Sequence, residues 1–174
     1  MTIRKILTEP DPFLRQKSNK VDQVNDEIRT LMDDMLETMY NAPGIGLAAI
    51  QVGVPKRVIV MDLSREDEKK NPLYFVNPEI ITNSNNDAAY EEGCLSVPGQ
   101  FAEISRPDKC KVKYLDYDGN EKILDTKGLL ATCIQHEMDH LEGILFIDYL
   151  SKLKKNMIVK KLSKQKKSLE RIVV

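Results

Sequence analysis

Residues 136–140 read His136-Glu137-Met138-Asp139-His140, and this stretch contains both histidines of the chain. A spacing of four residues puts the two imidazoles on one face of a helix, one turn apart, where both can bind one metal ion. Glu137 lies beside them, where a general base for a metal-bound water would sit. The stretch therefore predicts a helix that carries two metal ligands and a catalytic carboxylate.

The helix around this motif is expected over residues 126–141. Gly143 suits its C-terminal cap. Its apolar stripe consists of Leu130, Ile134, Met138 and Leu141. Two further helices are expected because apolar residues recur there at helical spacing as well.

The first of these, over 26–40, begins after the N-cap Asn25 and ends before Pro43, and its methionine-rich stripe is expected in the core. The other, over 152–170, has Leu153, Met157 and Leu162 among lysines, and these three residues could dock it on the body.

Strands are expected where β-branched and apolar residues cluster. A hairpin is indicated by an alternating segment, a turn at Asp118-Gly119 and a returning segment. The expected strands are 57–63, 73–82, 111–114 and 122–124. Because helices and strands do not alternate regularly, the order predicts an α+β fold with antiparallel sheets.

Composition narrows the class of protein. A chain of 174 residues with 41% hydrophobic and 30% charged residues is ordinary for one soluble domain. No apolar run reaches membrane-spanning length, and residues 1–10 lack the pattern of a signal peptide. Three cysteines, an odd number, favour a reducing compartment over a disulfide framework, so a cytoplasmic protein is expected.

The net charge of −1 is distributed unevenly along the chain. Residues 151–174 hold eight lysines and Arg171 against the single acid Glu170, a net charge of +8. Residues 1–150 then hold 17 basic and 26 acidic groups, a net charge of −9. This pattern fits an anionic partner and a solvated helix face equally well.

A catalytic metal needs a third protein ligand besides the two histidines. Phe146 occupies the place of the third histidine in the extended H-E-x-x-H-x-x-G-x-x-H pattern, which excludes that class of metalloprotease. The downstream glutamates are poor candidates, because Glu142 abuts the motif and Glu170 lies in the lysine-rich tail. The third ligand is therefore sought among the cysteines.

Cys133 shares the helix face but lies seven residues from His140, about 10.5 Å along the axis, which is awkward for metal–ligand bonds of about 2.0–2.3 Å. Cys110 falls on the apolar side of a predicted strand and reads as core. Cys94 sits between Gly93 and Gly99 in a shaped loop or strand end, where site residues concentrate. We therefore expect Cys94, His136 and His140 to bind the metal.

Three separate segments now resemble one family, the peptide deformylases. They are GIGLAAIQ at 44–51, EGCLS at 92–96 and HEMDHLEG at 136–143. The third is shared among metallohydrolases, but the three together, in this order, are highly specific. The resemblance extends from the N-terminal segment through the basic C-terminal helix, as in the bacterial form with a helical tail.

This resemblance implies antiparallel sheets around a central metal-binding helix. It implies a catalytic domain over 1–150, with 151–174 as a basic helix of the same domain. The implied reaction removes the formyl group from the N-terminal formyl-methionine of nascent polypeptides, and Glu137 would accept and return the proton. One thiolate and two imidazoles suit Fe(II), Zn, Ni or Co, and Fe(II) comes first because members of that family commonly use it.

The resemblance also assigns roles to further residues. The Gln51 amide and the Leu95 backbone N–H would stabilise the oxyanion, although Gln51 read alone would be a polar loop residue bonded to backbone. The slot for methionine would be lined by residues that could otherwise be core, namely Ile45, Gly46, Leu129 and Cys133, with Tyr90 at its rim.

One departure from the family is Phe101, because many bacterial members carry a basic residue near this point. The contacts on this rim are therefore left open by the resemblance. Glu92 and Arg106 are expected to form an ion pair that braces the cysteine loop, and Asp139 is expected to be structural.

The expected partners are formyl-Met nascent peptides and, through the basic C-terminal helix, the ribosome. A zinc metalloendopeptidase remains an alternative, because it would use the same water and glutamate. A non-enzymatic ribosome-binding module with a structural metal is the other, although such sites usually have four protein ligands. Activity on formyl-Met peptides but not on casein would separate the two enzymes.

Overall fold

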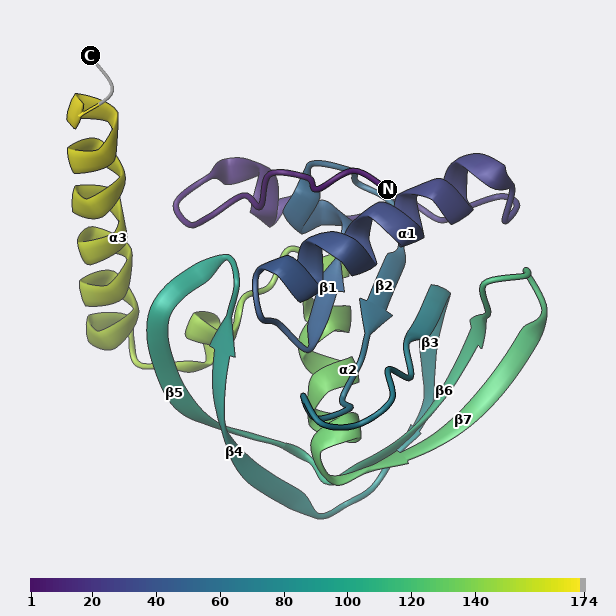
Figure 1. Cartoon of the computed structure of the whole chain (residues 1–174). Coiled ribbons are helices and arrows are strands. Elements are labelled where there is room, and N and C mark those ends of the chain that lie inside the picture. The colour runs from purple at the N-terminus through teal and green to yellow at the C-terminus, as the bar shows by residue number, and fades with distance from the viewer. Residues whose placement is uncertain (173–174) are drawn as a thin grey trace.

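The computed structural model describes residues 1–172 and has the predicted α+β architecture (Figure 1). Its long helices are α1 (Asp26–Asn41), α2 (Gly128–Leu141) and α3 (Lys152–Ile172). Single 3₁₀ turns are η1 (Pro12–Arg15), η2 (Ala49–Val52) and η3 (Phe146–Tyr149). The strands are β1 (Gly46–Ala48), β2 (Val58–Met61), β3 (Leu73–Asn83), β4 (Asp87–Cys94), β5 (Val97–Pro107), β6 (Lys109–Leu115) and β7 (Glu121–Lys127).

The strands form two antiparallel sheets, one of five strands in the order β1-β2-β3-β6-β7 and one made of the β4–β5 hairpin. Helix α2 lies between them and contacts both sheets (Figure 1). This confirms the expected arrangement of antiparallel sheets around a central helix. It also brings the strand that ends at Cys94 next to the helix that carries both histidines.

Strand β2 shows how the core is divided, because its alternate side chains enter different layers. Val58 and Val60 pack with α1 on one face, and Ile59 and Met61 pack with α2 on the other. All four are fully buried. A strand buried on both faces reads as a continuous apolar run, which is the pattern seen in the sequence.

Most predicted elements agree with the structure to within a few residues. Asn25 caps α1 by accepting the backbone N–H of Ile28 at 3.0 Å. The expected helix start at 126 is wrong, because Thr126 and Lys127 still belong to β7 and pair with β6. Gly143 follows the end of α2 with a φ of 75°, the left-handed conformation expected after a helix.

The long β4–β5 hairpin was not predicted. Its inward positions include the charged residues Glu92 and Arg106, both buried. Those charges obscure the alternation of polar and apolar residues by which a half-buried strand is recognised.

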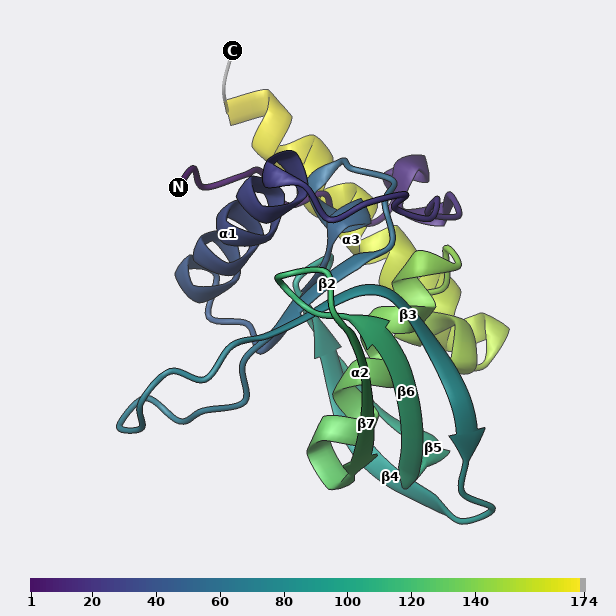
Figure 2. The same cartoon turned by 90° about the vertical axis from the view of Figure 1, so that its right-hand side faces the viewer.

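Helix α3 contacts the body through β5 and η3, and its C-terminal end projects beyond the rest of the molecule (Figure 2). Leu162 is buried in a cluster with Val97 and Phe146, as predicted. Leu153 and Met157 are 72% and 63% exposed, so the expectation that they dock the helix is wrong. Leu153 and Met157 lie on the face of α3 that turns away from the body. Half-buried Ile158 and Val159 pack against the cluster around Leu162 instead. Residues 173–174 of the predicted tail lie outside the described residues.

No helix within residues 1–172 is long and apolar enough to cross a membrane.

Candidate metal centre and pocket

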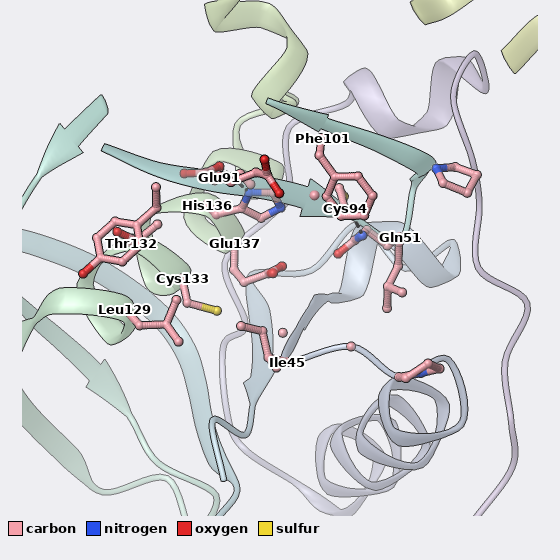
Figure 3. Close-up of a pocket in the computed structure, with 18 of the residues that line it drawn as sticks. Ile45, Gln51, Glu91, Cys94, Phe101, Leu129, Thr132, Cys133, His136 and Glu137 are labelled. Atoms are coloured by element: carbon pink, nitrogen blue, oxygen red, sulfur yellow. Dashed lines mark hydrogen bonds and ion pairs between the residues drawn. The ribbon is translucent and has the colours of Figure 1, made fainter. Parts of the chain in front are cut away.

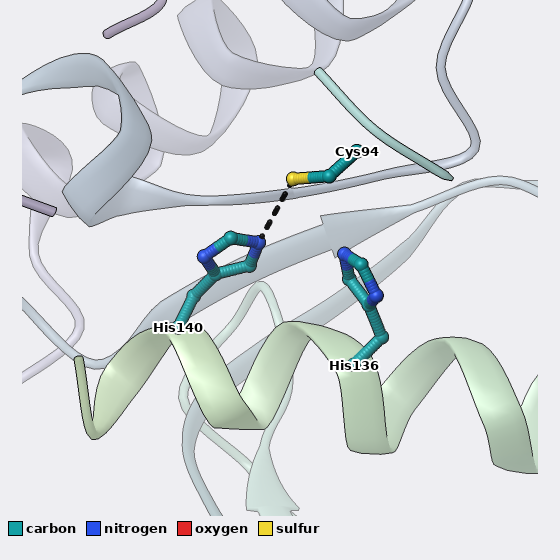
Figure 4. Close-up of side chains that lie close together, drawn as sticks. All are labelled: Cys94, His136 and His140. Atoms are coloured by element: carbon teal, nitrogen blue, oxygen red, sulfur yellow. Dashed lines mark hydrogen bonds between the residues drawn. The ribbon is translucent and has the colours of Figure 1, made fainter. Parts of the chain in front are cut away.

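Helix α2 holds His136 and His140 one turn apart, and both side chains are buried. Their rings point toward the end of β4, as Figure 4 shows. His140 Nε2 lies 3.3 Å from Cys94 Sγ. One ligand atom from each of Cys94, His136 and His140 lies within 4.8 Å of the others. The structure thus brings together the three residues that the sequence predicted as ligands.

Cys94 is aimed at α2 by an irregularity in the hairpin. Gly93 pairs with Phe101, but Cys94 pairs with Val97, so the register shifts between the two positions. The Cys94 sulfur also accepts the backbone N–H of Ser96 at 3.4 Å, which fixes its direction. A register shift of this kind commonly re-aims a side chain next to a functional site.

The other two cysteines lie outside this cluster. Cys110 is buried with its sulfur 3.0 Å from Thr126 Oγ1, as expected for a core residue. Cys133 is buried on α2. Burial raises the pKa of both thiols, which keeps them neutral.

His136 is held in place by Glu92, which forms a buried ion pair with Arg106. Its Nδ1 lies 2.9 Å from Glu92 Oε2, which leaves Nε2 for the cluster. Arg106 donates to the two oxygens of Glu92 at 2.6 and 3.0 Å. Burial favours the neutral acid, but the bonds from His136 and Arg106 outweigh it and hold the pKa of Glu92 below its usual range. The predicted Glu92–Arg106 pair is confirmed.

The network continues to Asp139, whose carboxylate accepts from Arg106 at 2.8 Å and from the Tyr149 hydroxyl at 2.7 Å. Asp139 is therefore structural, as the sequence analysis expected. Through Arg106, Asp139 thus supports Glu92, the carboxylate that contacts Nδ1 of His136. Such a contact sets the tautomer and the orientation of the imidazole ring.

Glu137 is buried, and its Oε2 has no hydrogen-bond partner. Burial raises the pKa of Glu137 to about 7. Gly46 of β1 lies against this carboxylate, and a Cβ at that position would come within 2.5 Å of Glu137 Oε1. Strand β1 can approach α2 this closely only because Gly46 has no side chain. Glu137 faces a pocket at this point.

Gln51 is buried and oriented by three contacts. Its Oε1 accepts the backbone N–H of Ala48 at 2.9 Å. Its Nε2 donates to Ser96 Oγ at 3.0 Å and lies 3.6 Å from Cys94 Sγ. The Gln51 amide therefore lies at the cluster, held partly by backbone as a loop residue would be. Ser96 was not predicted as a site residue, although it lies two residues after Cys94 within the EGCLS segment.

A cavity of about 450 Å³ opens beside these groups (Figure 3). Its walls include every residue expected around methionine, namely Ile45, Gly46, Tyr90, Leu129 and Cys133. Ile45 and Leu129 are 45% and 47% exposed, which argues against core packing as their role. Thr132 also lines the cavity and was missed, although it lies one helical turn before His136.

Comparison with known proteins gives a consistent result. The model of the family described as polypeptide deformylase matches residues 3–156. The chain is 67% identical to a peptide deformylase from Pelagibacter ubique over all 174 residues, which is 100% of both chains. It is 62% identical to one from Phenylobacterium zucineum over 97% of this chain and 99% of that relative.

Solved structures agree. A crystal structure of peptide deformylase from Ehrlichia chaffeensis superposes with a TM-score of 0.91 at 44% identity, covering 96% of this chain and 98% of that one. A structure of peptide deformylase from the same organism in complex with actinonin superposes equally well at 46% identity, covering 95% and 98%.

Proposed function

Because this chain belongs to the peptide deformylase family and so removes the formyl group from nascent formyl-Met peptides, we propose that Cys94, His136 and His140 hold the metal ion on which this family depends. The observation that carries this assignment is the convergence of their ligand atoms beside Glu137 at an apolar pocket.

The donor set fits such an ion. A thiolate and two imidazoles suit Fe(II), Zn, Co and Ni, and we propose Fe(II) first because members of this family commonly use it. The bond from His136 Nδ1 to Glu92 leaves the other ring nitrogen for coordination. Three protein ligands are the number that catalytic sites use, whereas structural sites usually have four. When bound, the metal ion would lower the pKa of a coordinated water and polarise the formyl oxygen.

Glu137 is the proposed general base and acid. As water adds to the formyl carbon, the Glu137 carboxylate accepts its proton. Glu137 then returns the proton to the amine nitrogen while the carbon–nitrogen bond breaks, which releases formate and a free N-terminus. The unpartnered Oε2 at the pocket supports this role, since it leaves an acceptor available for the water.

The oxyanion that forms on the formyl group needs hydrogen-bond donors. We assign the Gln51 amide and the Leu95 backbone N–H to this role. Gln51 is held at the cluster by Ala48 and Ser96, and Leu95 follows the ligand Cys94 directly. Preorganised donors of this kind stabilise the transition state without moving during the reaction.

The methionine side chain would enter the apolar end of the pocket. Leu129 and Cys133 of α2 form one side of it, with Ile45 opposite. Tyr90 also lines the pocket, and we assign it to the rim of the methionine slot. Gly46 lets the substrate backbone approach Glu137, because it has no side chain in the way. Ile45 and Leu129 would lose their solvent exposure on binding, which favours an apolar substrate group.

An anaerobic preparation tests this function directly. The enzyme should contain one metal ion per chain and release formate from formyl-Met-Ala-Ser, while unformylated casein remains intact. Cleavage of casein would favour an endopeptidase instead. Stoichiometric metal with no hydrolysis of either substrate would favour a structural site.

We also propose that α3 directs this enzyme to the ribosome, in the cytoplasm where formylated chains emerge. Residues 151–174 carry a net charge of +8, and Lys160, Lys161, Lys164 and Lys167 are all exposed. Such lysines can neutralise RNA phosphates, and binding of this kind weakens steeply with salt. The burial of Leu162 against β5 and η3 supports our assignment of 151–174 as a basic helix of the same domain as 1–150.

Replacement of those four lysines by glutamate tests the docking. Because the substituted positions point to solvent and lie away from the pocket, hydrolysis of short formyl-Met peptides should persist. Co-sedimentation with ribosomes at moderate salt should be lost. Unchanged co-sedimentation, or binding indifferent to salt, would leave α3 a purely structural helix.

A further inference from the structure

The pocket is lined by one more exposed apolar side chain than the proposed methionine slot uses. Phe101, Ile45 and Leu129 all line it, and they are 65%, 45% and 47% exposed. Ile45 and Leu129 belong to the proposed methionine slot. Phe101 lies on the other side of Glu137 from Leu129 and Cys133 (Figure 3). A large apolar surface left in water inside a substrate pocket indicates a second contact for the ligand.

The Phe101 ring packs closely against the neighbouring strand of the hairpin. It lies over Gly93, its register partner on β4, and a Cβ on Gly93 would come within 2.5 Å of Cε1 of the ring and 2.7 Å of Cδ1. Gly93 immediately precedes Cys94, the proposed metal ligand. The missing side chain at Gly93 therefore lets an aromatic ring lie one residue from the reaction centre.

An extended peptide places successive side chains on opposite sides of its backbone, about 3.3 Å apart along the chain. With the methionine side chain against Leu129 and Cys133, the next side chain points the other way, toward Phe101. We propose that Phe101 determines specificity for the residue that follows formyl-methionine, and that it favours a bulky apolar side chain there. This inference rests on the proposed function.

The hairpin around the ring carries negative charge. Glu91 and Glu103 are register partners, two positions along from Gly93 and Phe101, so they share the same face of the hairpin. Both carboxylates are exposed, and Glu91 also lines the pocket. An acidic side chain at the second position of the peptide would be repelled there, so Asp is the least favoured residue.

Steady-state kinetics on matched peptides test the proposal. The metal-loaded enzyme would be assayed with formyl-Met-Leu-Ser, formyl-Met-Ala-Ser and formyl-Met-Asp-Ser. We expect kcat/KM for the Leu peptide to exceed that for the Ala peptide by about threefold to tenfold, the range for a few methylenes on a partly open surface. The gain should lie in KM, because the ring contacts ground state and transition state alike.

Phe101→Ala should reduce the Leu-to-Ala ratio to about one, whereas Phe101→Leu should retain most of it. Ile81→Ala is the matched control, since Ile81 is 46% exposed on β3 and does not line the pocket, and it should keep the wild-type ratio. Metal content and melting temperature would confirm that each variant is folded.

A wild-type ratio of one, or an undiminished ratio in Phe101→Ala, would overturn the inference while leaving the proposed function intact. Failure of the metal-loaded wild type to release formate from any of the peptides would instead overturn the proposed function, and the inference with it.

Discussion

Replacement of Arg106 by methionine should destabilise the protein and weaken metal binding together. The Arg106 side chain is 5% exposed and bonds to Glu92, which is 4% exposed, and to Asp139. Methionine fills a similar volume but leaves a buried carboxylate without its cation. Loss of one partner of a buried pair costs about 3–5 kcal/mol. At about 2–4 °C per kcal/mol for a chain of this size, melting should fall by roughly 6–20 °C.

The metal should also be bound less tightly, because Glu92 orients His136 through Nδ1 at 2.9 Å. Loss of such a supporting contact typically weakens metal affinity about 10–100-fold. Thermal melting of the metal-free protein would measure the first effect, and competition with a chelator would measure the second.

Arg57→Met is the matched control, because the Arg57–Glu142 pair has the same 2.6 Å separation but side chains that are 17% and 42% exposed. Solvent screens that pair, so its loss should cost less than about 1 kcal/mol and leave metal affinity unchanged. The double variant Glu92→Leu with Arg106→Met should regain stability but not metal affinity. Equal melting temperatures for Arg106→Met and Arg57→Met would refute the reasoning. Full metal affinity in the double variant would refute it as well.

The catalytic assignments give further tests. Cys94→Ala should lose most of the metal and the activity, while Cys110→Ala should keep both at a stability cost of about 1 kcal/mol, since Cys110 is buried away from the cluster. Full metal content in Cys94→Ala would show that the ligand is wrong. Glu137→Ala should keep the metal while formate release falls about 10²–10⁴-fold, and wild-type rates would contradict the proton-transfer role. Gln51→Leu should keep the metal and slow turnover about 10²–10³-fold, and an unchanged kcat would remove it from the oxyanion site.

Local sequence patterns determined the elements that depend on short-range interactions. The spacing of His136 and His140 predicted a helix with both imidazoles on one face, because helical periodicity is a local property. The cap at Asn25 and the β6–β7 hairpin followed from residues within a few positions of one another. The family resemblance, carried by three short motifs, indicated the activity and the residues expected at the site.

Only the tertiary structure decided how distant segments meet. Glu92 and Arg106 are charged residues at inward positions of β4 and β5, and their burial is tolerated because each satisfies the other while Glu92 also holds His136. The helical spacing of Leu153 and Met157 does not reveal which face of α3 the body covers, and the structure leaves both exposed. The seating of Phe101 on Gly93 likewise depends on strand register, which is fixed by pairing across the hairpin and is not a property of either segment alone.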